Sequence, residues 1–260
     1  MNIIVMSLFA GVIGMGLGGV ITAIFGTRTD KMISIFLSFA GGVMVSIVLI
    51  ELIPEAIEFS NVWVAVLGLA LGALMVMILN NLMDKITKKE DSTSKLHETY
   101  AEFFHSSEII DSGKRSMLRS GIIMLVAIAL HNIPEGLAMG AAGYHDAALG
   151  LTIAIMIGLH NIPEGMAISA PLISGGFSKL KTLILVMLTG ATTVVGAVAG
   201  VLIGGISDLA LALSFSIAGG AMLYVVFGEI LPQSIVTNKD RVPTVFALVG
   251  IAVGLLFTQI

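Results

Sequence analysis

The sequence predicts an all-α, polytopic membrane protein, and three observations lead to that class. Of the 260 residues, 57% are apolar and only 12% are charged, which lies well outside the range of soluble domains. The apolar residues form runs of about 20, the length that crosses a bilayer as an α-helix. These runs lack the two-residue alternation of a membrane β-barrel, and backbone amides in lipid must be satisfied within their own segment.

Eight apolar segments have the length expected of a transmembrane helix. They cover residues 3–25, 32–53, 62–83, 120–142, 147–170, 182–204, 209–233 and 244–259. The first segment has no basic leading region and no small-residue cleavage site, so we interpret it as a retained span and not as a signal peptide. We therefore expect a single transmembrane domain over residues 1–260.

The connections between the spans are short, except for residues 84–119. This segment carries seven Lys and Arg residues among acids, serines, His97 and His105. Its charge and low apolar content predict a mobile, partly helical loop between the third and fourth spans.

The distribution of basic residues predicts the orientation of the chain. All 13 Lys and Arg residues fall in the first, third, fifth and seventh connections, which eight helices place on the same face. The positive-inside rule makes that face cytoplasmic, so we expect both termini outside a cell inner membrane or plasma membrane. The opposite connections hold only acids, which would attract cations: Glu55, Glu58, Asp146 and Asp208.

The second and seventh spans resemble each other in sequence. Residues 39–54 (FAGGVMVSIVLIELIP) and 217–232 (IAGGAMLYVVFGEILP) are identical at seven of sixteen positions. In the predicted topology these two spans run in opposite directions, and inverted repeats are typical of transporters whose site lies near the membrane midplane. Small-residue runs recur in any packed membrane bundle, but that alternative does not explain the matched Glu and Pro.

The motif HNIPEG occurs twice, starting at His131 and again 29 residues later at His160. Each histidine lies roughly 16–20 Å along its helix from the start of its span, at about 1.5 Å per residue. Both motifs therefore reach the middle of a ~30 Å hydrocarbon layer, and they enter it from opposite sides.

The residue types of the motif indicate a cation site. His and Glu are four apart within each motif and share one helix face. Two such faces opposed would bring His131, Glu135, His160 and Glu164 together as two nitrogen and two oxygen ligands, a set suited to divalent first-row metals. Zinc is the first candidate, and iron(II), manganese, cobalt and cadmium also fit. With no cysteine in the chain, thiolate sites are excluded.

Proline and glycine in the motif also have a predicted role. Pro134 and Pro163 lack the N–H that would bond four residues back, which leaves the carbonyls of Leu130 and Leu159 without a helical partner. Such carbonyls can bind cations or water near the midplane, and a kink there would widen the space between helices. The glycine that ends each motif permits close approach of another backbone.

A buried polar pair that only holds the two spans together is the alternative interpretation. It explains two histidines, two asparagines and two carboxylates at matched depth poorly, because each ionisable group in the membrane costs at least ~2.5 kcal/mol.

At these residues the chain resembles the ZIP family of divalent metal transporters, and most closely its bacterial ZupT and GufA-like branch. The resemblance covers all eight spans, the long third connection and the doubled motif. It implies uptake of zinc and other divalent ions into the cytosol by a 3+2+3 bundle with inverted repeats and an elevator-like sliding motion. It further implies no enzymatic activity, no bound cofactor beyond the transported ion, and often a homodimer.

The resemblance also implies a ligand set. The first metal site would contain His131, Glu135, His160 and Glu164. The second would contain Asn132 and Asn161, with the two glutamates bridging. Relatives that bind two metals often add a glutamate from the sixth span, but residues 182–204 contain no acid and Thr193 stands about where it would be. This departure predicts a weaker second site, or none.

Several residues remain open between a functional and a structural role. Glu51 and Glu229 precede Pro54 and Pro232 in the repeat and would act as relay or entrance groups, or else cap helices or snorkel at the membrane boundary. Met44 and Met222 are expected to be packing residues. His97 and His105 are expected to lie in a solvated loop, although some family members have metal-sensing histidines there.

Two other functions compete with metal transport, and a purely structural scaffold is a third. A membrane-embedded metalloenzyme would use three ligands and an open water position, but the HExxH motif is absent and no pair of nucleophile and base stands out in the sequence. A transporter of protons or another cation would use His and Glu as a charge relay. We expect divalent ions and the bilayer as partners, and no nucleic acid.

Overall fold

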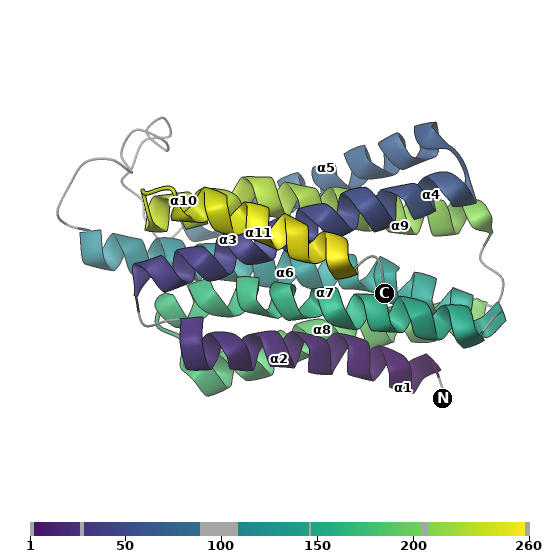
Figure 1. Ribbon diagram of the computed structural model, residues 1–260, viewed down its shortest axis with the longest axis horizontal. Helices are drawn as coiled ribbons and strands as arrows, with labels where there is room; N and C mark the ends of the chain where they lie inside the picture. Colours follow the sequence, from purple (N-terminus) through teal and green to yellow (C-terminus); the bar gives the residue numbers. More distant parts are fainter. Residues whose placement is uncertain (1–2, 27–28, 89–108, 146, 204–206, 258–260) are drawn as a thin grey trace.

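The computed structural model is a bundle of helices that lie side by side along one common direction (Figure 1). It describes residues 3–26, 29–88, 109–145, 147–203 and 207–257, and no strand occurs among them. Seven helical segments in this part of the chain are long and apolar enough to cross a membrane. The prediction of an all-α, polytopic membrane protein is therefore confirmed.

The eighth predicted span is shorter than the others. Its apolar helix covers Val242–Leu256, and 15 residues at about 1.5 Å each fall short of a ~30 Å hydrocarbon layer. A total of eight spans stays a prediction.

Three spans contain π-helical turns within otherwise α-helical segments. The first consists of α1 (Ile3–Leu8), η1 (Phe9–Ile13), α2 (Gly14–Ile21) and η2 (Thr22–Gly26). The second consists of α3 (Asp30–Ile47), η3 (Val48–Leu52) and α4 (Ile53–Phe59), and the seventh of α9 (Asp208–Val225), η5 (Val226–Ile230) and α10 (Leu231–Thr237). The others are α5 (Val62–Lys88), α6 (Ile109–His145), α7 (Ala147–Ser174), α8 (Lys179–Ile203) and α11 (Val242–Phe257).

The helices extend further than the apolar runs. Pro54, which ends the predicted second span, lies inside a continuous helical segment, in the first turn of α4 and directly after the π-helical turn η3. The helix therefore continues through Glu55 and Glu58, which were expected in a connection. Residues 84–88 and 109–119 of the predicted loop are helical as well, while 89–108, with His97 and His105, lie outside the described residues.

The helix contacts of the first half of the chain have equivalents in the second half, as expected of a two-fold repeat. The first span packs on α7 as α8 packs on α6, and α3 packs on α11 as α9 packs on α5. In the centre, α3 contacts α7 and α9 contacts α6. Figure 1 shows that α6 and α7 run in opposite directions, as do α3 and α9. Two groups of three helical segments, the second of which includes the shorter α11, thus flank α6 and α7 as an inverted repeat.

Glycine contacts define this repeat residue by residue. A side chain at Gly42 would overlap with the backbone of Ala247, and one at Gly220 would overlap with the backbone of Leu69. Both members of the first contact lie 178 positions from their counterparts in the second. Only glycine allows backbones to approach this closely, which is typical of packed membrane helices.

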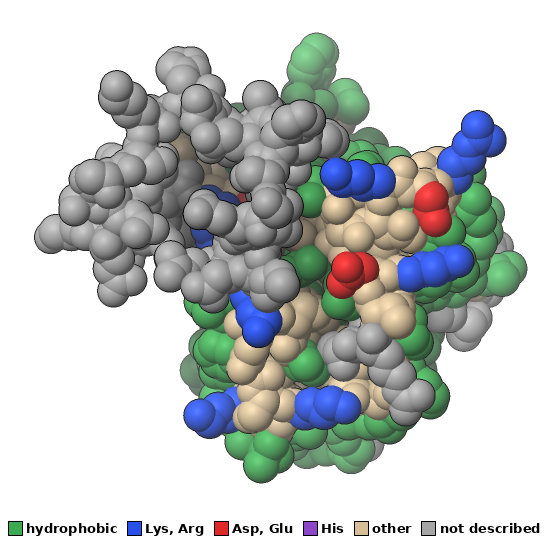
Figure 2. Space-filling view, turned by 90° about the vertical axis from the view of Figure 1, so that its left-hand side faces the viewer, with side chains coloured by type: hydrophobic (Ala, Val, Ile, Leu, Met, Phe, Trp, Pro, Cys, Tyr) green, Lys and Arg blue, Asp and Glu red, His purple; other side chains and the backbone are tan. Residues whose placement is uncertain are grey.

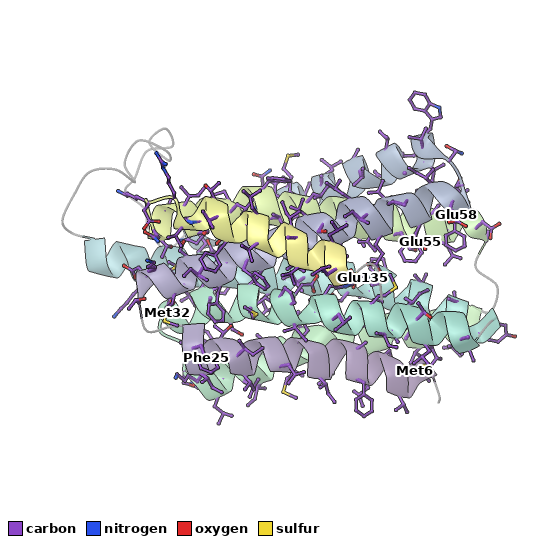
Figure 3. All side chains as sticks on the ribbon, in the orientation of Figure 1. Met6, Phe25, Met32, Glu55, Glu58 and Glu135 are labelled. Carbon is purple, nitrogen blue, oxygen red and sulfur yellow. The ribbon has the colours of Figure 1, made fainter. Side chains whose placement is uncertain are left out.

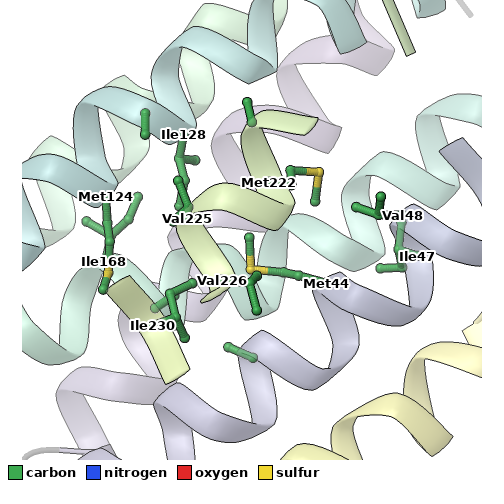
Figure 4. Close-up of a cluster of buried hydrophobic side chains, with 14 of the residues drawn as sticks. Met44, Ile47, Val48, Met124, Ile128, Ile168, Met222, Val225, Val226 and Ile230 are labelled. Atoms are coloured by element: carbon green, nitrogen blue, oxygen red, sulfur yellow. The ribbon is translucent and has the colours of Figure 1, made fainter. Parts of the chain in front are cut away.

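Charged and apolar side chains are separated along the bundle. Figure 2 shows Lys and Arg side chains gathered at one end, where α3, α6, α8 and α11 begin. This agrees with basic connections on a single face, although its cytoplasmic identity stays a prediction. Figure 4 shows the buried apolar cluster where α3 and α9 meet α6 and α7, which includes Met44, Met124, Ile168 and Met222. Met44 and Met222 are thus confirmed as packing residues.

Candidate metal-binding site

The two HNIPEG motifs face each other across the contact between α6 and α7. His131 Nε2 lies 3.1 Å from Glu164 Oε1, and His160 Nε2 lies 3.3 Å from Glu135 Oε2. Each histidine therefore pairs with the glutamate of the other helix, although its own glutamate shares its face. All four side chains are at most 1% exposed, and Glu135 lies in the interior of the bundle (Figure 3).

Three of these side chains form a compact group. His131, Glu135 and Glu164 each place one ligand atom within 4.8 Å of the other two. Ligand atoms around a tetrahedral zinc ion lie roughly 3.3 Å apart, given metal–ligand distances near 2.0–2.2 Å. Small side-chain movements would thus suffice to close this group on an ion, and His160 contacts it through Glu135.

The helices that hold the motifs are uninterrupted at their prolines. Pro134 and Pro163 lie inside α6 and α7. The glycines that follow act as predicted, because a side chain at Gly136 would overlap with the backbone of Thr193, and one at Gly165 with that of Met15. The first motif is therefore held by close contact with α8, and the second by close contact with the first span.

The asparagines lie next to this group and bond outward to neighbouring helices. Asn132 Nδ2 donates to the Thr189 carbonyl at 3.4 Å, and Asn161 Nδ2 donates to the Ala10 carbonyl at 3.0 Å. These two carbonyls were not foreseen, since nothing in a local motif specifies which backbone lies beside it. Both asparagines are 0% exposed.

Several buried oxygen atoms at the motifs have no hydrogen-bond partner among the described residues. They are Glu135 Oε1, Glu164 Oε2, Asn132 Oδ1, Asn161 Oδ1 and the nearby Thr193 Oγ1. A buried polar atom without a partner costs about 1–3 kcal/mol, so unpaired oxygens in such number need an explanation. Oxygen atoms of this kind fit a divalent cation, which would satisfy several of them at once.

Glu51 and Glu229 occupy equivalent places in the repeat but have different surroundings. Glu51, in η3, lies close enough to His160 and Glu135 to interact electrostatically with both. Glu229, in η5, accepts hydrogen bonds from Asn80 Nδ2 and Ser120 Oγ, each at 3.2 Å. Their predicted roles as relay or entrance groups stay predictions.

The fold and the buried groups define a class of protein, namely helical membrane proteins with imidazole and carboxylate groups at the centre of the bundle. The family comparison is more specific, because the model of the ZIP zinc transporter family matches residues 1–260. The chain belongs to this family.

Curated proteins similar to this chain have the same description. They include the zinc transporters ZupT of Akkermansia muciniphila (35% identical, 53% of this chain and 52% of the relative) and Streptococcus mutans (28%, 53% and 51%). A third is ZupT of Nitratidesulfovibrio vulgaris (30%, 56% and 54%). The chain spans about half the length of the curated relatives it matches.

Proposed function

We propose that this protein transports divalent metal ions, zinc first among them, into the cytosol through a site near the membrane midplane. The ligands are His131, Glu135, His160 and Glu164. The observation that carries this proposal is the pair of His–Glu contacts between α6 and α7, at 3.1 and 3.3 Å, with all four side chains at most 1% exposed. Four ionisable side chains in lipid cost at least ~2.5 kcal/mol each, which a purely structural contact does not require.

Family membership supports transport over the competing functions. The matching family is described as zinc transporters, and so are the similar curated proteins. Iron(II), manganese, cobalt and cadmium accept the same nitrogen and oxygen ligands, so they are secondary substrates in this proposal. A carrier must also release its ion, and a site without thiolates suits that requirement.

A second, weaker ion is proposed beside the first. Asn132 and Asn161 offer amide oxygens without partners, and the glutamates can bridge. Thr193 is 0% exposed. Its hydroxyl faces Gly11 of the first span, where an added Cβ atom would lie 3.0 Å from it. A neutral hydroxyl attracts a cation less than a carboxylate would, which weakens this second position.

Sliding of one helix group past another would move the ion. The site-bearing group comprises the first span, α6, α7 and α8, and the flanking group comprises the second, third, seventh and eighth predicted spans. Among the described glycines, close backbone contacts occur within these groups, such as Gly136 on α8 and Gly42 on α11. The boundary between the groups is instead formed by flexible apolar side chains, including Met44, Met124 and Met222, which repack readily.

The proposed direction is inward, with the basic end of the bundle in the cytosol and the termini outside. A bacterial inner membrane is the proposed location, in keeping with the similar bacterial proteins. The homodimer implied by the family stays a prediction.

Uptake into proteoliposomes tests the proposal. Purified full-length protein is reconstituted, and accumulation of Zn²⁺, Fe²⁺, Mn²⁺, Co²⁺ and Cd²⁺ is measured for the wild type, His131→Ala and Glu164→Gln. We expect both variants to lose zinc uptake by at least about a hundredfold, because each leaves a buried partner unpaired and removes a ligand.

The matched control is Glu58→Gln, which changes an exposed glutamate at the end of α4 (Figure 3). It removes one charge from the acids predicted to attract cations and no ligand, so zinc uptake should change by less than about twofold. Undiminished zinc uptake by both site variants would contradict the site, and proton flux without metal uptake in the wild type would favour a charge relay.

A further inference from the structure

The first span contains one residue more than its counterpart α8 beside the asparagines. The acceptor carbonyls belong to Ala10 and Thr189, which are 179 positions apart. Further along, the glycines that pack on the backbones of Ile162 and Ile133 are Gly18 and Gly196, which are 178 positions apart. The extra residue is accommodated by the π-helical turn η1, since such turns insert one residue into an α-helix.

This turn changes the bonding of the Ala10 carbonyl. In a regular α-helix the N–H of Gly14 would donate to Ala10, but here it donates to the carbonyls of Phe9 and Gly11. The Ala10 carbonyl is thereby available to Asn161 Nδ2, at 3.0 Å in a fully buried position. Gly14 makes this possible, because a side chain there would lie 3.0 Å from the Cβ of Asn161.

The other asparagine is held less firmly. Its acceptor, the Thr189 carbonyl, lies within an uninterrupted helix and already accepts from Thr192 Oγ1 at 2.7 Å. The bond from Asn132 Nδ2 is 3.4 Å long, beyond the usual range for an N–H···O bond. The two asparagines are therefore equivalent in sequence but not in restraint.

We propose that η1 is a positioning element that presets Asn161 as a cation ligand while Asn132 stays free to reorient. This inference rests on the proposed metal site. Amide nitrogen and oxygen belong to one planar group, so the bond to Ala10 also fixes Oδ1, which has no partner of its own. Asn161 and Glu164 are three apart on α7 and lie on neighbouring positions of its surface. A preset ligand binds more tightly, because no rotamer freedom is lost on binding.

An amide-to-ester substitution tests the role of the Ala10 carbonyl directly. Replacing Gly11 with glycolic acid turns that carbonyl into a weaker ester acceptor and leaves every side chain intact. The chain offers a matched control, because Gly190 follows Thr189 in the same way. Both esters lose one helical N–H, and the ester at Gly190 also weakens the bond that the Thr189 carbonyl accepts from Thr192 Oγ1. A larger loss with the ester at Gly11 is therefore attributable to the bond from Asn161.

We expect the ester at Gly11 to weaken binding of the second zinc ion about fivefold, the effect of one ordinary hydrogen bond, and the ester at Gly190 to weaken it less than about twofold. Binding of the first ion should be the same in both esters. Binding is measured on the solubilised full chain by competition with a chromophoric zinc chelator. The ¹¹³Cd chemical shift of the cadmium-loaded protein reports the ligand set, and it should change only with the ester at Gly11.

The possible failures are distinguishable. Wild-type protein that binds no zinc would refute the proposed function itself. Zinc binding by the wild type that shows no second ion, or equal effects of the two esters on that ion, would overturn the positioning role. If either ester fails to fold, Asn161→Ala and Asn132→Ala decide, since the former should weaken binding several times more, and equal losses would contradict the inference.

Discussion

The N-terminal half of the molecule contains the first three predicted spans, and the C-terminal half contains the last three. The two halves contact the central helices α7 and α6 at equivalent backbone positions. Gly18 meets the backbone of Ile162 on α7, and Gly196 meets the equivalent Ile133 on α6. The side chains placed on this common frame are not equivalent. Glu51 lies near the histidine of α7, whereas Glu229 is bonded to Asn80 and Ser120.

This difference separates two tasks. A repeated backbone of opposite orientation can present one central site to either side of a membrane, because each half closes on it in the same way. Direction must then come from residues that differ between the halves. Ser120, eleven residues before His131, corresponds to Leu149 before His160, and leucine has no hydroxyl to bond across the boundary.

The backbone equivalence of the halves can be broken at either crossing. Gly18→Ala and Gly196→Ala each place a methyl group against a backbone, so both should destabilise the protein by about 1–3 kcal/mol. We expect the two variants to lose similar amounts of thermal stability in detergent, on the order of 5 °C.

Gly16→Ala is the control for this pair. Its new methyl group would lie 3.3 Å from the flexible side chain of Met187 and not against a backbone, so its stability should stay close to that of the wild type. A large loss in only one of the two crossing variants would show that the halves are not equivalent even in their backbone.

The arrangement of the helices was largely predictable, because transmembrane helices have a clear signature in the sequence. Apolar length gave the spans, and the matched Ala-Gly-Gly, Glu and Pro of residues 39–54 and 217–232 indicated the inverted repeat. Helix ends were less predictable, since Pro54 ends an apolar run but the helix continues through it to Phe59. The depth of the HNIPEG motifs followed from helical rise alone, and it placed His131 and His160 near each other.

The surroundings of the motifs could not be predicted, because they depend on neighbours remote in the chain. Nothing near Asn161 in sequence indicates the carbonyl of Ala10, 151 positions away. The π-helical turn that makes this contact possible leaves a trace only in the shift of register between the first span and α8. The cluster around Glu229 was missed for the same reason, since Asn80 and Ser120 come from two other spans.

The difference between the two halves can be tested at Ser120, which has no equivalent hydroxyl in the other half. Its hydroxyl contacts Glu229 at 3.2 Å and Gln233 at 3.3 Å, and so joins α6 to the seventh span at the basic end of the bundle. Ser120→Ala removes both bonds across the sliding boundary. We expect the population of the arrangement described here to fall by about five- to tenfold relative to its alternative.

A single cysteine reports this change, because the chain has none of its own. Met124→Cys replaces a side chain buried at the boundary, and its labelling by a membrane-impermeant maleimide from the basic side should be about five times faster with Ser120→Ala. Ser174→Ala, which removes only a bond to Ala170 within α7, is the control. Equal labelling of Met124→Cys with and without Ser120→Ala would show that Ser120 does not stabilise the present arrangement.

The smallest expected effect is at Thr193, which packs on Gly136 much as Met15 packs on Gly165. Its buried hydroxyl has no partner among the described residues, so Thr193→Val should raise the free energy of unfolding of the metal-free protein by up to about 1 kcal/mol. Thr189→Val removes a bonded hydroxyl on the same helix and should give no such gain.

If Thr193 contributes to the second ion, calorimetric titration of Thr193→Val with zinc should show the first ion unchanged and the second weakened. A metal-free protein made less stable by Thr193→Val would show instead that the hydroxyl already has a partner, and would remove it from the ligand set.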